Sequence, residues 1–383
     1  MIKIIFLILP FIIMFIPNRD YDLMSKEDTL VFKGIFSIIV ILHHVSQVEN
    51  NLPIIHYFAN FGMYAVSVFF FISAYGMTKQ VKLNREKYLK GFFKKRFFKL
   101  LLPIFIVTII YIVLNILIFH KAYTISSIIN VYKSGSSIIN NGWYLNSILV
   151  IYLIFYFSFK FFKNIKISYL IFSFLIFVYI FVLKRIGFGI WWYNSMIGMI
   201  FGMYFEIFEE KIKRVLSTHF YKILLIISIW SFYIANNREY NIINMFSKMG
   251  IYSNYAIIQN ILCLNFIIMI LLISKKINFR ELVIHKSFYY KKTKSIGKYN
   301  VNFIAESSKV YSKFVLIRNR VLSFLGKISF EMYMIHGLVM RILALYLKVD
   351  IVYLLTLFGL TIISSYLLNL LFKKLYIALN LNK

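Results

Sequence analysis

Residues 100–119 read LLLPIFIVTIIYIVLNILIF, a run of 20 residues without a charged side chain. A helix needs about 20 mostly apolar residues to cross the hydrocarbon core of a bilayer, so this run predicts a transmembrane helix. The rest of the chain has the same character. Of its 383 residues, 61% are hydrophobic and 15% are charged, whereas soluble domains are about 25% charged. This composition excludes a soluble enzyme, a disordered tail and a fibrous repeat.

Similar apolar runs recur along the whole sequence. The candidate spans are 2–17, 30–47, 61–78, 100–119, 143–162, 166–183, 190–208, 220–236, 256–274, 321–345 and 351–372. The first run is short and contains Pro10, which favours a separate short helix at 1–17. The sequence therefore predicts an all-α, polytopic transmembrane helical bundle with ten core spans, formed by residues 18–383.

The net charge of +30 is spread over the loops between these runs. Loop 79–99 carries nine Lys and Arg residues and loop 275–320 carries twelve. If both loops are cytoplasmic and the sides alternate, 34 Lys and Arg lie on the cytoplasmic side and 8 on the other. This asymmetry fits the positive-inside rule and predicts a cytoplasmic C-terminus in the inner membrane. The dispersed charge argues against a nucleic-acid partner, and loop 275–320 is expected to lie on anionic lipid headgroups.

Ionisable side chains inside the membrane are candidates for function. Lys33 and His44 are eleven residues apart, which is about 16.5 Å along a helix. We therefore expect Lys33 at the cytoplasmic interface and His44 near the middle of the bilayer. An anionic cosubstrate could then enter at Lys33 and react at His44. The alternative is a snorkelling lysine and a histidine used for helix packing.

Three further side chains lie near these depths. Arg96 and Lys99 share one helix face at the cytoplasmic end of a span, where they could bind phosphates or lipid headgroups. Ser73, in the phenylalanine-rich stretch 68–76, is expected near the middle of the bilayer. Its hydroxyl could also simply bond to the preceding helical turn.

The stretch 329–337 carries a second group of polar residues. Ser329, Tyr333 and His336 share one helix face, and His336 has a depth comparable to that of His44. Glu331 has two interpretations. It could form an ion pair with Lys327, or it could orient a catalytic imidazole.

Two other motifs give weaker indications of function. Trp143, in the stretch 141–145, could belong to the aromatic belt of the membrane interface or could form a platform for stacking a sugar. Gly198 and Gly202 form a small-xxx-small pattern, for which close helix packing is a sufficient reason.

Taken together and in order, these motifs resemble the membrane-bound acyltransferase-3 family. The family patterns Arg-x10-His, FF-x-x-S-G, Arg-x-x-Arg, WFL, G-x-x-x-G and S-x-x-x-Y-L-x-H are similar to Lys33–His44, Phe70–Ala74, Arg96–Lys99, Trp143–Leu145, Gly198–Gly202 and Ser329–His336. The segment Phe70–Ala74 is one residue shorter before its Ser, and Ala74 and Met334 replace Gly and Leu. Lys33 and Lys99 replace Arg, which keeps the charge but loses the bidentate fork.

The resemblance implies a bacterial O-acyltransferase that moves an acyl group, usually acetyl, from coenzyme A on the cytoplasmic side to a hydroxyl of a surface polysaccharide or related glycan. It implies catalytic roles for His44 and Glu331. It also implies cosubstrate binding by Lys33, Arg96 and Lys99, and acceptor binding by Ser73, Trp143, Tyr333 and His336. No metal and no permanently bound cofactor are expected, only acetyl-CoA as cosubstrate.

Several alternatives stay open from the sequence. His44 could act as a general base or carry the acyl group covalently, and only the x10 spacing favours it over His43. A transporter or flippase for a glycan or lipid-linked substrate would also place His and Glu inside the membrane. A non-catalytic scaffold with altered motifs is the third interpretation.

Overall fold

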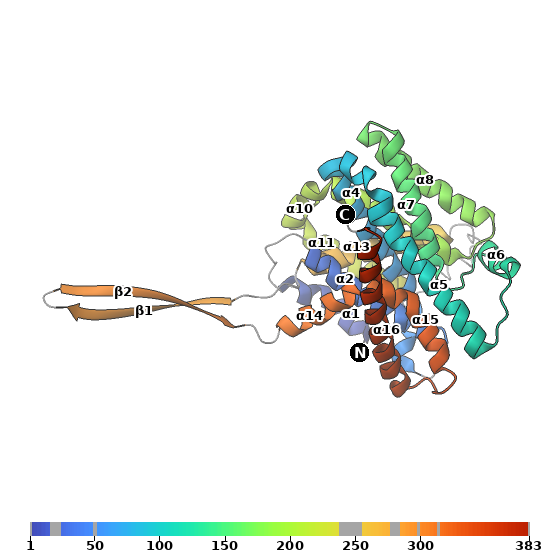
Figure 1. The fold of residues 1–383 in the computed structure, drawn as a ribbon. Coiled ribbons are helices and arrows are strands. Elements are labelled where there is room, and N and C mark those ends of the chain that lie inside the picture. Colours follow the sequence, from blue (N-terminus) through green and yellow to red (C-terminus); the bar gives the residue numbers. More distant parts are fainter. Residues whose placement is uncertain are drawn as a thin grey trace.

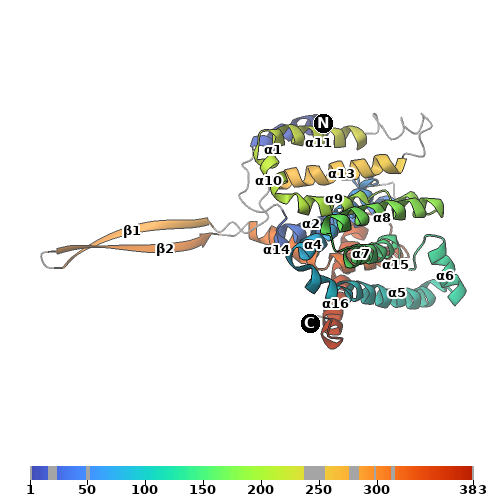
Figure 2. The same cartoon turned by 90° about the horizontal axis from the view of Figure 1, so that it is seen from above.

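The computed structural model describes residues 2–15, 24–48, 52–236, 255–275, 284–296, 299–311 and 315–381. These residues form a bundle of helices from which one β-hairpin projects (Figures 1 and 2). The predicted helical bundle is confirmed, and the hairpin is an addition to it.

The described residues of the N-terminal half form ten helical elements. They are α1 (Ile2–Phe15), α2 (Lys26–Ser46), α3 (Pro53–His56), α4 (Phe61–Lys90), the π-helical turn η1 (Phe93–Phe97), α5 (Phe98–Phe119), α6 (Ile125–Lys133), α7 (Trp143–Phe161), α8 (Ile165–Arg185) and the 3₁₀ turn η2 (Ile190–Trp192). The following elements are α9 (Ile197–Ile207), α10 (Glu209–Ser217), α11 (Phe220–Asn236), α13 (Tyr255–Ser274), β1 (Ile284–Ile296), β2 (Tyr299–Tyr311), α14 (Val315–Lys327), α15 (Ser329–Leu343) and α16 (Ile351–Ala378).

Seven of the described helices are long and apolar enough to cross a membrane. They are α2, α4, α5 together with η1, α7, α8, α13 and α16. The pair α10 and α11 gives an eighth candidate if it counts as one broken span, since the two helices meet at 97°. The chain is therefore a multi-pass membrane protein by length and composition, but the count of ten spans is not confirmed.

The number of long apolar helices is lower than the predicted ten partly because two of the apolar runs are each broken into two shorter helical elements. Run 190–208 divides into η2 and the 11-residue α9, and run 321–345 divides at Ile328 into α14 and α15. Helix α11 has 17 residues and α1 only 14, with Pro10 inside it. Hydropathy averaged over a whole run does not register such breaks, because the apolar residues on either side outweigh the polar residues at the break, which are Asn194 and Ser195 before α9 and Ser329 at the start of α15.

Helix α4 is the central element of the bundle and contacts α2, α7, α9 and α13. Glycines allow the closest of these contacts. A Cβ atom on Gly198 or Gly202 of α9 would collide with the backbone carbonyl of Ser67 or Phe71 in α4. The two backbones can approach so closely only because both positions lack a side chain, as the small-xxx-small pattern predicts.

Helix α2 is fixed at its start and along its side. Ser25 and Asp28 form a capping box at its N-terminus, which satisfies backbone N–H groups that have no partner within the helix. Gly34 packs against the carbonyl of Leu322 in α14, and Gly326 of α14 packs against Leu30. Helix α2 also contacts α4 and α15, so the side chains at its C-terminal end occupy defined positions.

The polar segment 275–320 contains strands β1 and β2. They pair antiparallel from Ile284 opposite Tyr311 to Ile296 opposite Tyr299. Both views show the hairpin projecting away from the helices on the side where α10 and α14 lie (Figures 1 and 2). The sequence predicted only a basic loop here, and its contact with lipid headgroups stays a prediction.

Candidate active site

His44 lies in the last turn of α2 and is buried, with 8% of its surface exposed. Its ring stacks on that of His336 from α15, with centroids 5.1 Å apart and planes inclined by 19°. The ring of His43 lies 5.0 Å from that of His44. Helix α2 begins at Lys26 and ends at Ser46, so His44 is close to the C-terminal end of the helix, and its depth in the bilayer stays a prediction.

One chain of hydrogen bonds assigns the protons of both histidines in α2. His43 Nδ1 lies 3.1 Å from the carbonyl oxygen of Phe58, which can only accept, so neutral His43 carries its proton on Nδ1. His43 Nε2 then accepts from Gln47 Nε2 at 3.1 Å. Gln47 Oε1 lies 3.1 Å from His44 Nδ1 and accepts its proton. His44 Nε2 is left with a lone pair, the state that a general base needs.

His336 has the same proton arrangement by a different route. Its Nδ1 lies 3.0 Å from the carbonyl oxygen of Met332, so Nδ1 carries the proton and Nε2 the lone pair. His336 is fully buried, and among the described residues its Nε2 has no hydrogen-bond partner. The stacked histidines thus bring two basic nitrogens from two helices to one place.

A cavity of about 500 Å³ adjoins this histidine pair. We call it the histidine cavity. Its lining comes from the end of α2, the start of α4, the segment before α7, and from η2, α13 and α15: Val40, His43, His44, Gln47, Ala59, Asn60, Gly62, Met63, Val66, Ser134, Gly135, Ser136, Ser137, Asn141, Gly142, Trp143, Trp191, Asn194, Gln259 and Tyr333. Among these described residues none is Asp, Glu, Lys or Arg, so the lining is polar but carries no fixed charge.

Two walls of the histidine cavity are fixed by side-chain hydrogen bonds. The hydroxyl of Tyr333 donates to the carbonyl of Asn141 at 2.6 Å. Asn141 has a φ of 58°, a left-handed conformation that Asn tolerates better than most residues. In another part of the lining, Asn194 Nδ2 donates to Gln259 Oε1 at 3.1 Å. Trp143 also lines the cavity.

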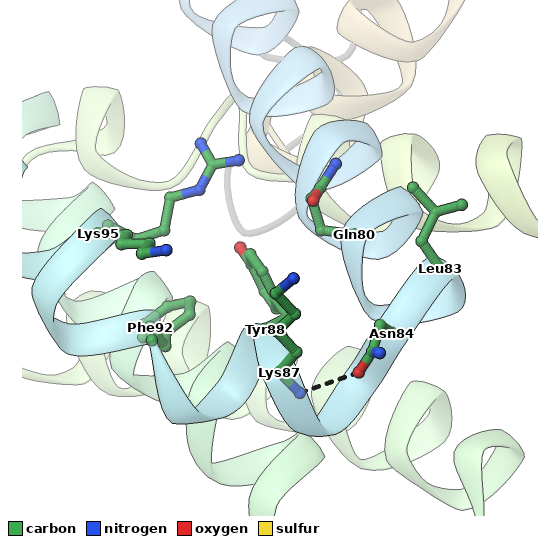
Figure 3. Close-up of a pocket in the computed structure, with 9 residues that line it drawn as sticks. Gln80, Leu83, Asn84, Lys87, Tyr88, Phe92 and Lys95 are labelled. Carbon is green, nitrogen blue, oxygen red and sulfur yellow. Dashed lines mark hydrogen bonds between the residues drawn. The ribbon is translucent and has the colours of Figure 1, made fainter. Parts of the chain in front are cut away.

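A second cavity, of about 350 Å³, lies at the other end of α4. We call it the basic cavity. It is lined by Gln80, Leu83, Asn84, Lys87, Tyr88, Gly91, Phe92, Lys95 and Arg96. Helix α4 is interrupted at Asn84, whose side chain accepts from the backbone N–H of Lys87 at 3.0 Å (Figure 3). Tyr88 stands in the middle of the view, between Lys95 and Gln80.

The cations predicted from the sequence gather at this end of the bundle. Arg96, in the π-helical turn η1, lies with its guanidinium 5.9 Å from the ring centre of Tyr88. Lys33 and Lys99 are both close enough to Arg96 to interact with its charge. Of these three, only Arg96 lines the basic cavity; Lys99 lies over the ring of Tyr376 at 5.4 Å. The cavity can hold phosphate groups through Arg96, Lys95 and Lys87.

Glu331 lies apart from both imidazoles. Its Oε1 accepts from Asn369 Nδ2 of α16 at 2.9 Å, and its charge interacts with Lys373 rather than with Lys327. The structure therefore supplies no direct contact through which Glu331 would orient His44 or His336.

Ser73 also lies outside both cavity linings. Its hydroxyl interacts with that of Tyr144, whose ring packs 5.2 Å from the ring of Tyr333. Ser73 thus supports the wall of the histidine cavity from behind. Among the described residues, no three His, Cys, Asp or Glu side chains are grouped so that they could hold a metal ion.

Several residues of this site were missed from the sequence. Gln47 follows His43 and His44 at helical spacing, so the i+3 and i+4 rule could have revealed it. Asn194 and Gln259 are 65 residues apart, and no local pattern connects them. Tyr88 stands in a basic loop, where an aromatic residue could have suggested a cation partner.

A comparison with protein-family models matches residues 31–370 to the family Acyl_transf_3, described as an acyltransferase domain. The chain belongs to the acyltransferase-3 family. The matched range contains the residues that line both cavities and every site residue predicted from the sequence. The two cavities therefore lie within the acyltransferase domain. Searches of curated proteins and of solved structures gave no match.

Proposed function

We propose that this acyltransferase moves an acetyl group from acetyl-CoA, bound at the cytoplasmic face, to a hydroxyl of an uncharged cell-surface glycan. The observation that carries the proposal is the lone pair on Nε2 of His44 at the wall of a cavity whose described lining carries no fixed charge. A buried imidazole in this state can take a proton from a hydroxyl. The basic cavity at the other end of α4 supplies the matching site for an anionic donor.

The two cavities suit the two ends of the donor. Coenzyme A carries several phosphate charges, and Arg96 and Lys95 in the basic cavity can form charge-assisted hydrogen bonds to them. Val66 and Gln80, which line the two cavities, are about 21 Å apart along α4. The neutral pantetheine arm and thioester would bridge this distance between the helices.

The chemical step follows from the proton arrangement. His44 Nε2 removes the proton from the acceptor hydroxyl, and the hydroxyl oxygen attacks the thioester carbonyl carbon. The new C–O bond forms as the C–S bond breaks, and the His44 imidazolium returns the proton to the departing thiolate. The products are the acetyl ester and free coenzyme A.

The lining of the histidine cavity favours an uncharged acceptor. Amides of Asn194 and Gln259 can bond sugar hydroxyls, while the rings of Trp143 and Trp191 can pack on the apolar faces of a sugar. An anionic group entering this cavity would lose its hydration without meeting a cation among the described lining residues, which costs free energy.

The proposed membrane arrangement has ten crossings, with α9, α11 and α15 added to the seven long apolar helices. The bias of 34 Lys and Arg against 8 supports an arrangement with the basic cavity and the C-terminus in the cytoplasm. The histidine cavity would then open towards the outer half of the membrane, where a surface glycan is available.

Purified protein in liposomes tests this function directly. With deuterated acetyl-CoA and an uncharged glucan oligosaccharide, we expect one deuterated acetyl group on the glucan for each coenzyme A released. The His44→Ala variant, reconstituted at equal amount, is the matched control and should release coenzyme A at least about 100-fold more slowly. Movement of the oligosaccharide across the bilayer without coenzyme A release would instead identify a transporter.

A further inference from the structure

Gln47 lies immediately after α2, at the residue that caps its C-terminus. Its side chain folds back over the last turn of the helix, where His43 and His44 are its neighbours four and three residues earlier. The amide bonds to both rings, each at 3.1 Å. Gln47 is therefore the only described residue that a hydrogen bond joins to both histidines of α2.

The group between the two rings must donate a hydrogen bond to His43 and accept one from His44. Phe58 fixes the proton of His43 on Nδ1, so His43 Nε2 needs a donor. His44 can keep a lone pair on Nε2 only if Nδ1 holds the proton, and Nδ1–H needs an acceptor. A carboxylate offers only acceptors and an ammonium only donors, whereas a primary amide has both an NH₂ group that donates and a carbonyl oxygen that accepts. If the amide of Gln47 were reversed, its oxygen would face the lone pair of His43.

We propose that Gln47 is a positioning residue which holds His44 in the tautomer with its proton on Nδ1 and its lone pair on Nε2. The inference rests on the proposed function, since it assigns Gln47 to the same reaction. Gln47 acts through His44 and does not itself exchange a proton with the acceptor. The carbonyl of Phe58, at the far end of the chain of hydrogen bonds, sets its direction.

The test has a spectroscopic readout that needs no substrate. Full-length protein labelled with ¹⁵N-histidine is studied in bilayers by solid-state NMR, and a His44→Asn spectrum identifies the His44 signals. Wild type should show protonated Nδ1 and unprotonated Nε2. Gln47→Leu should transfer a measurable fraction of the proton to Nε2. Gln47→Glu, which still accepts from Nδ1, should keep the wild-type tautomer.

Ser46→Ala is the matched control, because it removes a hydrogen bond of the same helical turn, from the Ser46 hydroxyl to the His43 carbonyl at 2.6 Å, without touching either ring. It should leave the His44 signals unchanged. In the acetyl-CoA assay, Gln47→Leu should lower kcat about 10-fold with KM for acetyl-CoA within about 2-fold, as for other residues that orient a functional imidazole. Gln47→Glu should recover part of that loss.

An unchanged His44 tautomer in Gln47→Leu, or an equal change in Ser46→Ala, would overturn the proposal. The spectra also separate it from the proposed function. If wild type turns over no acetyl-CoA but the tautomer shifts in Gln47→Leu, the acyl transfer proposal fails and the positioning role stands. If wild type is active and the tautomer does not shift, the reverse holds.

Discussion

The histidine cavity and the basic cavity lie at opposite ends of α4 and differ in how they are built. The histidine cavity joins residues from six parts of the chain, and its walls are fixed by hydrogen bonds such as Tyr333 to Asn141. The basic cavity is made by one continuous stretch, 80–96, with long exposed cations. A reaction needs fixed geometry, whereas binding of a polyanion needs charge. This difference supports our proposal that the chemical step takes place at one end of α4 and donor binding at the other.

Replacing His44, the proposed general base, should have the largest effect of the four substitutions, and this effect should fall on kcat. In His44→Ala we expect kcat to fall by about 10²- to 10⁴-fold, the range that general-base catalysis supplies. KM for acetyl-CoA should stay near wild type, because the donor phosphates bind at the other end of α4. Rates with saturating acceptor, on equal amounts of reconstituted protein, measure this. A KM change as large as the kcat change would mean that the two cavities are not separate in function.

Removal of the main cation of the basic cavity should give the opposite kinetic pattern. Arg96→Gln should raise KM for acetyl-CoA about 10- to 100-fold, since a hydrogen bond to a charged group contributes about 1.5–3 kcal/mol. Arg96→Lys should lose less, because it keeps the charge but not the fork. Titration of acetyl-CoA in the same assay gives both values. A pure loss of kcat in Arg96→Gln would remove it from donor binding.

The amide wall of the histidine cavity should affect only the acceptor. Asn194→Leu removes the amide that donates to Gln259, and we expect KM for the glucan oligosaccharide to rise about 10-fold, with donor KM unchanged. The reason is that the loss of one hydrogen bond near a bound hydroxyl costs about 1 kcal/mol or somewhat more. Initial rates over a range of acceptor concentrations measure it. If donor KM changes instead, the assignment of this cavity to the acceptor is wrong.

Glu331 should give the smallest effect of the four. Glu331→Gln keeps an oxygen that can accept from Asn369 and removes a charge that contacts neither imidazole, so kcat should change less than about 3-fold. The same assay compares it with wild type, with His44→Ala as reference. A loss approaching that of His44→Ala would restore the sequence-based hypothesis that this carboxylate orients a catalytic histidine.

The sequence predicted more of the lining of the histidine cavity than of the basic cavity. His44, Trp143 and Tyr333 all line the histidine cavity, whereas of Lys33, Arg96 and Lys99 only Arg96 lines the basic cavity. Helical spacing placed Arg96 and Lys99 together but did not show that Lys99 lies over the ring of Tyr376. His44 and His336 were matched only by their expected depth, which did not reveal the stacking of their rings. The pairing of Asn194 with Gln259 depends on how η2 and α13 pack, and no local pattern encodes that. The breaks at Ile328 and before α9 were missed because each lies within a run that is apolar on average, although Asn194 and Ser195 precede α9 and Ser329 follows Ile328.

The central claim, that donor binding and chemistry are separate, is tested most directly by equilibrium binding of acetyl-CoA to three reconstituted proteins by isothermal titration calorimetry. The account predicts that His44→Ala binds acetyl-CoA within about 2-fold of wild type although its kcat is at least about 100-fold lower. It also predicts that Arg96→Gln binds at least about 10-fold more weakly. Weakened binding in His44→Ala together with wild-type binding in Arg96→Gln would contradict it.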